Sequence, residues 1–144
     1  MPAVASAPVT AARSRAGRGV VEAPAVGRGA AVAIAICVPL ALASEAVADG
    51  DGSLLTPLLF AAVLVGLAIG GRTAARRAAG APFTNGGLAA LLAFVVIQGA
   101  AFVAGLGDGD TPAVPVLVFN GLLAYACGLA GGAVAARSRE ARRA

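Results

Sequence analysis

Four long apolar runs follow one another along the chain, separated by short polar stretches. They cover about residues 30–48, 54–71, 86–105 and 113–136. Each is close to the ~20 residues that a helix needs to cross ~30 Å of hydrocarbon. Because lipid offers backbone groups no hydrogen-bond partners, an open chain crosses it only as helix. The pattern therefore predicts an all-α polytopic membrane protein with four transmembrane helices, arranged as two hairpins.

A basic tail lies before the first run and another after the fourth. Residues 1–29 show no sustained helical period, so we expect a disordered cytoplasmic tail. Residues 30–136 form the predicted transmembrane domain, and 137–144 a second tail. One alternative is that Ala41-Leu42-Ala43 is a signal-peptidase site and that the first run is cleaved. The long preceding tail and the three spans that cleavage would leave argue against it.

The charged residues predict the orientation of the spans. All eleven basic residues are arginines, and they lie before the first run, between the second and third, and after the fourth. The other two connections hold acids and no arginine. Since excess arginine stays cytoplasmic, we expect both termini in the cytoplasm and the protein in the plasma (inner) membrane. Arg72, Arg76 and Arg77 with the two tails could attract anionic lipid.

Composition narrows the function classes. Hydrophobic residues make up 59% and charged residues 12%, against roughly 25% charged in soluble domains, and the mean hydropathy is +0.88. Without histidine there is no Ser-His or Cys-His pair. We therefore expect no enzyme, no cofactor, no metal centre and no nucleic-acid partner.

Cys37 and Cys127 lie at similar predicted depths. This suggests that the first and fourth spans are adjacent, with the two thiols close but reduced.

Glycines recur at matching depth in the second and fourth runs. Gly66 and Gly70 form one GxxxG step, and Gly128 and Gly132 form another. Small residues four apart let a second helix approach closely, so these four are predicted helix-packing positions. The stretches "GLAIGGRTAARR" and "GLAGGAVAARS" around them are similar, as are "DGDG" and "GDGD" in the other connections, which suggests a parallel internal repeat.

A few polar residues are candidates for chemistry. Gln98 and Asn120 are the strongly polar side chains near mid-membrane; they either form an interhelical hydrogen bond or line a substrate or ion path. Glu45 is either interfacial or a coupling carboxylate. The four aspartates of the acidic connections either close turns or form a weak cation site; they are Asp49, Asp51, Asp108 and Asp110.

The stretches "GGRTAARRAAGAPFTNGGLAALLAFVVIQ" and "VFNGLLAYACGLAGGAVAAR" resemble small four-span bacterial membrane proteins, mostly actinobacterial and of unknown function. The Ala-, Gly-, Val- and Arg-rich composition is also typical of GC-rich coding. The resemblance covers about residues 30–140. It implies a membrane location and a four-helix fold, and it implies no activity and no site residues.

Two functions remain open. One is a structural or interaction bundle that binds a membrane partner or lipid, or a second copy of itself. The other is a subunit of a small-solute or ion transporter, working as a homo-oligomer. Small multidrug exporters also have four spans, but they use a mid-membrane glutamate in the first span and aromatic contacts. Glu45 lies too far out and aromatic residues total 4%, so that comparison fails.

Overall fold

The computed structural model describes residues 21–48, 54–105 and 113–142, and over these ranges the chain is helical with no strand. The helices are α1 (Ala23–Ala48), α2 (Leu55–Arg77), α3 (Pro82–Gly105) and α4 (Val114–Glu140). All four are long and apolar enough to cross a membrane. The predicted all-α fold with four transmembrane helices is confirmed.

Four helix boundaries differ from the prediction. α2 continues to Arg77 rather than ending at residue 71, and α3 begins at Pro82 rather than at residue 86. α1 begins at Ala23 rather than at residue 30, and α4 continues to Glu140 rather than ending at residue 136. Ala25, Val26 and Ala30 at the start of α1 are buried, and Val26 packs with Ala74 and Ala89. This packing stabilises helix where the local sequence pattern alone predicted a disordered tail.

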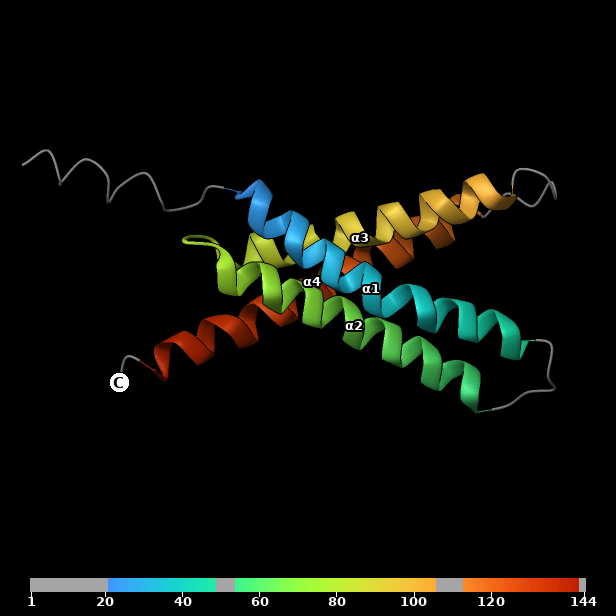
Figure 1. The fold of residues 1–144 in the computed structure, drawn as a ribbon, viewed down its shortest axis with the longest axis horizontal. Coiled ribbons are helices and arrows are strands. Elements are labelled where there is room, and N and C mark those ends of the chain that lie inside the picture. Colours follow the sequence, from blue (N-terminus) through green and yellow to red (C-terminus); the bar gives the residue numbers. More distant parts are fainter. Residues whose placement is uncertain (1–20, 49–53, 106–112, 143–144) are drawn as a thin grey trace, which may run out of the picture.

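The helices form two antiparallel hairpins, α1 with α2 and α3 with α4, that cross each other near the middle of the molecule (Figure 1). α2 packs on all three other helices, whereas α1 packs on α2 and α3 and, within the described residues, makes no packing contact with α4. We call the end with the start of α1, the α2–α3 connection and the end of α4 the arginine end. The opposite end, which holds the end of α1, the start of α2, the end of α3 and the start of α4, is the hairpin end.

The centre of the bundle is built from very small side chains. Ala33, Ala89, Ala90 and Ala93 are all 0% exposed, and Leu67 at 4% is the largest aliphatic side chain of the central cluster. Transmembrane helices gain little from apolar burial among apolar lipids, so they associate by close backbone approach. Alanine and glycine allow that approach, which explains why the core holds so few large residues.

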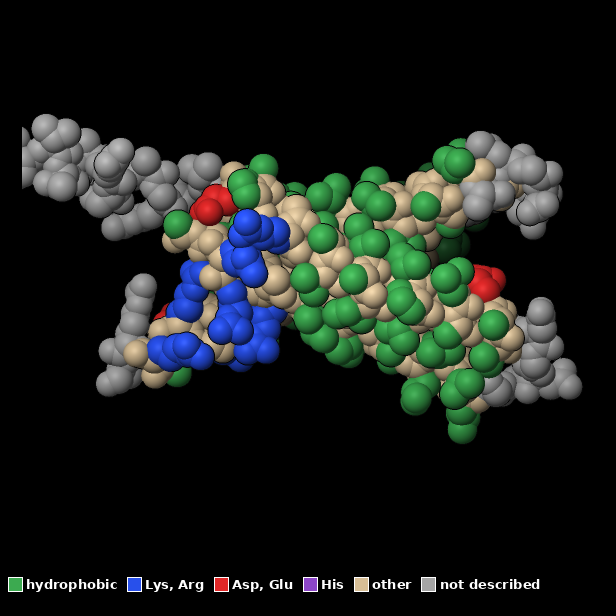
Figure 2. Space-filling model, in the orientation of Figure 1, with side chains coloured by type: hydrophobic (Ala, Val, Ile, Leu, Met, Phe, Trp, Pro, Cys, Tyr) green, Lys and Arg blue, Asp and Glu red, His purple; other side chains and the backbone are tan. Residues whose placement is uncertain are grey.

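Large apolar side chains instead cover the outside. Leu58, Val65, Val95, Val118 and Leu122 are among the exposed ones, and hydrophobic side chains are spread over the visible face between the two ends (Figure 2). Charged side chains gather at the ends, with the arginines together at the arginine end. This distribution suits a helical bundle surrounded by hydrocarbon.

Candidate functional site: a crevice between the hairpins

The two hairpins are held together where they cross by close glycine contacts. A Cβ on Gly70 would lie 2.6 Å from the Ala33 Cβ and 2.7 Å from the Gly29 carbonyl oxygen of α1. A Cβ on Gly71 would lie 2.6 Å from the Gly128 carbonyl oxygen of α4. Because backbone atoms cannot move aside as a side chain can, only glycine fits at these positions.

The structure places all four predicted packing glycines against a neighbouring helix. Gly66 and Gly70 face α1, at Cys37 and Ala33, while Gly128 and Gly132 face α3. Sequence reasoning missed an equally close set in the same crossing, which comprises Gly29, Gly71, Gly86 and Gly131. Three of these belong to Gly-Gly pairs, at 70–71, 86–87 and 131–132, and a pair presents glycine to two neighbours at once. That signal could have identified them.

A hydrogen-bond network joins three elements at the arginine end. The Glu22 carboxylate accepts hydrogen bonds from the backbone N–H groups of Ala79 (2.6 Å) and Gly80 (3.2 Å). The Glu22 N–H donates to Asn85 Oδ1 at 2.8 Å, and Asn85 Nδ2 donates to the carbonyls of Gly80 and Ala81. Asn85 is 0% exposed. The start of α1 is thereby fixed to the α2–α3 connection.

Arg139 adds the end of α4 to the same connection. Its guanidinium donates to the carbonyl oxygens of Ala75 (2.8 Å) and Ala78 (2.9 Å). These carbonyls lie in the last turn of α2 and at the residue that follows it, where backbone acceptors lack helical partners and a cation is favoured. Ala81 follows with φ = 43°, a left-handed conformation that is uncommon for alanine. The network holds this turn closed.

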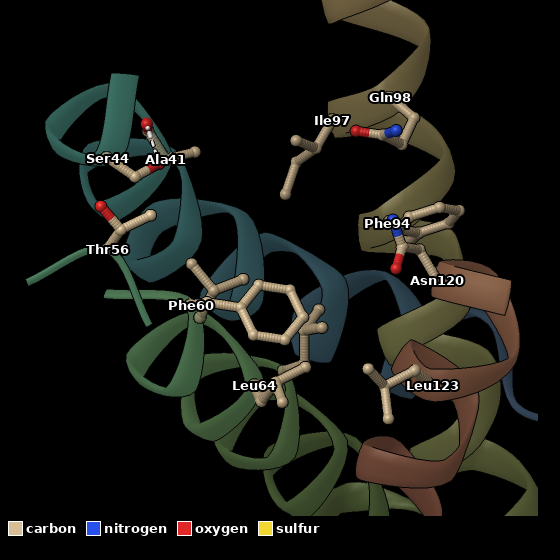
Figure 3. Close-up of a pocket in the computed structure, with 12 residues that line it drawn as sticks. Ala41, Ser44, Thr56, Phe60, Leu64, Phe94, Ile97, Gln98, Asn120 and Leu123 are labelled. Carbon is tan, nitrogen blue, oxygen red and sulfur yellow. Dashed lines mark hydrogen bonds between the residues drawn. The ribbon is translucent and has the colours of Figure 1, made fainter. Parts of the chain in front are cut away.

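On the other side of the crossing, in the half of the molecule nearer the hairpin end, a crevice of about 260 Å³ lies between the two hairpins. α1 and α2 contribute one wall, and α3 and α4 contribute the other (Figure 3). Most lining side chains are apolar, and Phe60 and Phe94 are the aromatic ones. The set comprises Ala41, Ser44, Thr56, Phe60, Val63, Leu64, Leu67, Phe94, Ile97, Gln98, Asn120 and Leu123.

The two predicted mid-membrane amides both line this crevice, Gln98 from α3 and Asn120 from α4 (Figure 3). Both are partly buried. Within the described ranges neither amide hydrogen-bonds to another residue, so the interhelical bond expected from the sequence is not formed. By contrast, the Ser44 hydroxyl donates to the Ala41 carbonyl at 2.7 Å. No charged side chain of the described chain lines the crevice.

The remaining predicted residues lie elsewhere. Glu45 is exposed on α1 and is not among the described residues that line the crevice. The four aspartates of the predicted cation site, Asp49, Asp51, Asp108 and Asp110, lie outside the described residues. They stay a prediction.

The predicted adjacency of the first and fourth spans is wrong. α1 and α4 lie diagonally across the bundle, as far as the two described helices show. Cys37 is 0% exposed and donates to the Val63 carbonyl of α2 at 3.4 Å, and Cys127 is partly buried at the edge of the same apolar cluster. Equal depth in the membrane fixes no lateral neighbour, and that is why the inference failed.

Comparison of the chain with protein-family models, with curated proteins and with solved structures gave no match.

Proposed function

We propose that this protein is a non-catalytic, membrane-embedded binding protein of the plasma membrane, and that its crevice takes a neutral lipid-like molecule. One observation carries the proposal: the amides of Gln98 and Asn120 line an apolar crevice without a hydrogen-bond partner in the described chain. An amide without a hydrogen-bond partner in an apolar environment costs about 2–7 kcal/mol. A bound molecule with a polar head would offset that cost.

The lining chemistry indicates the class of ligand. Each amide offers two N–H donors and one carbonyl acceptor, so a hydroxyl or ester head suits the site. A charged head does not, because no lining residue of the described chain carries an opposite charge. The volume of about 260 Å³ is slightly below the roughly 300–1,000 Å³ typical of small-molecule sites, which favours one slender apolar chain between Phe60 and Phe94.

Photolabelling of the full chain in vesicles tests this proposal. The probe is a monoacylglycerol with a diazirine in its acyl chain, and excess unlabelled monoacylglycerol is the competitor. We expect competed labelling on the peptides around Phe60, Phe94 and Leu123. The double variant Gln98→Leu/Asn120→Leu should lower it about fivefold to tenfold, since each intramembrane hydrogen bond contributes about 0.6 kcal/mol.

The matched control is Leu122→Ala, a change at a lipid-facing position beside Asn120 that does not line the crevice. It should leave the competed labelling unchanged. Labelling that is not competed, or that is equal in the double variant and in the parent chain, would contradict binding in the crevice.

A transporter subunit is the second candidate, and the position of the crevice favours it. The crevice lies to one side of the crossing, and at the crossing the bundle is closed by Ala74, Ala89 and Ala90, all 0% exposed. A site accessible from one side is what one state of an alternating-access cycle requires. Flux of a small solute into vesicles that is lost in the Gln98→Leu/Asn120→Leu variant would favour this candidate over simple binding.

A further inference from the structure

A second groove runs along the outside of the bundle between α2 and α4. It encloses about 200 Å³ and is lined by Val65, Ala68, Ile69, Arg72, Ala130, Gly131 and Val134. Its floor is closed, because a Cβ on Gly131 would overlap the Ala68 carbonyl oxygen and would lie 2.8 Å from the Arg72 backbone nitrogen. The groove is therefore shallow, apolar and open to the surrounding hydrocarbon.

Arginine stands at one end of this groove. Val65 and Arg72 are seven residues apart on α2, so the apolar part runs about 10 Å along the helix before it reaches the charge. The faces that wall the groove continue one turn further into Arg76 on α2 and Arg137 on α4, since residues three or four apart share a helix face. All three arginines are exposed.

These three arginines differ from Arg139, which is committed to two carbonyl oxygens. Over the described chain no hydrogen bond or ion pair engages the guanidinium group of Arg72, Arg76 or Arg137. Glu140 is the acid on α4 that follows Arg137 by one turn, farther from the groove. The mouth of the groove therefore keeps an excess of positive charge, at the end of the bundle where Figure 2 shows the arginine side chains gathered.

We infer that this groove binds an anionic phospholipid from the leaflet at the arginine end. The acyl chain lies between Val65, Ile69 and Val134, and the phosphate is held by Arg72 with Arg76 and Arg137. Guanidinium matches phosphate oxygens with two parallel N–H donors. The groove goes beyond the proposed function: it lies on the outer surface and shares no lining residue with the crevice.

Native mass spectrometry of the purified full chain tests this site. The probes are phosphatidylglycerol and phosphatidylcholine with identical acyl chains. We expect phosphatidylglycerol to be retained more strongly, and Arg72→Gln to weaken its binding about fivefold, because one basic residue near an anionic surface contributes about that factor. Ala130→Phe should weaken it as well by filling the groove from an exposed position.

Two matched controls separate this site from general attraction. Arg28→Gln removes the same charge from an exposed position on α1, and Ala31→Phe enlarges an exposed alanine of α1. Neither should change phosphatidylglycerol binding. The inference is overturned if Arg28→Gln weakens binding as much as Arg72→Gln, if Ala130→Phe has no effect, or if both lipids are retained equally.

Discussion

Asn85 is the residue on which the arginine end depends most. Its amide is fully buried and connects the Glu22 backbone to the carbonyls of Gly80 and Ala81. A buried polar group costs about 1–3 kcal/mol when its partner is removed. Loss of this one side chain leaves the Glu22 N–H, just before α1, and the carbonyls of Gly80 and Ala81 without this hydrogen-bond partner.

We therefore expect Asn85→Ala to destabilise the protein by about 2–3 kcal/mol, measured by thermal unfolding in detergent. Thr84→Ala, at the exposed neighbouring position, is the control and should change stability by less than about 0.5 kcal/mol. Equal unfolding temperatures for the two variants would show that the hydrogen bonds of Asn85 do not hold this end together.

At the scale of helices, glycine stabilises the bundle at some positions and destabilises it at others. In open helix interior, glycine costs roughly 0.5–1 kcal/mol relative to alanine. At Gly27 in α1 and Gly99 in α3, an added Cβ would meet no atom within 4 Å other than those of the surrounding helix backbone. Gly70, in contrast, meets the backbone oxygen of Gly29 at 2.7 Å, so an added methyl there forces α1 and α2 apart.

Gly70→Ala should lower the unfolding temperature in detergent. Gly132→Leu should lower it further, because leucine is larger than alanine and its Cβ would lie 2.8 Å from the Pro82 carbonyl oxygen. Gly27→Ala and Gly99→Ala are the controls, and each should be neutral or raise stability by up to about 1 kcal/mol. Four variants with the same small loss would indicate that only helix propensity matters.

The internal repeat is less regular in space than in sequence. Gly70 packs on Gly29 and Ala33 of α1, and Gly128 makes the matching contact with Gly86 and Ala90 of α3. The sequence similarity instead pairs Gly66 with Gly128, which is one helical turn away. α2 also packs on α3, whereas its counterpart contact, α1 with α4, is missing from the described residues. The duplication stays a prediction.

For the whole molecule, sequence reasoning succeeded where the length of the apolar runs decides the structure. Four runs near 20 apolar residues leave few alternatives in lipid, so the helices and their order were predictable. The start of α1 was not, because Ala25 and Val26 are helical through contacts with residues far along the chain. The crevice was not either: Gln98 and Asn120 were identified as polar, but no sequence pattern brings Phe60 of α2 opposite them.

The side of the membrane on which each end lies is the last prediction. The arginine end holds Arg28 near the start of α1, Arg72 and Arg76 near the end of α2, and Arg137 and Arg139 near the end of α4. Such an excess of arginine stays cytoplasmic. A reporter that is active only in the cytoplasm should therefore work when fused after Arg77 or Ala144, and fail after Asp51 or Asp110.

The chain also contains the control for that experiment. Changing Arg72, Arg76 and Arg77 together to glutamine removes the charge bias of the middle connection while leaving both tails intact, so activity after Arg77 should fall in part of the molecules. Activity after Asp51 in the parent chain would overturn the four-span topology, and a mature N-terminus at Ser44 would show that the first span is cleaved. In that case Ala41 would be lost from the crevice wall that it lines beside Ser44, and the binding proposal would fail with the topology.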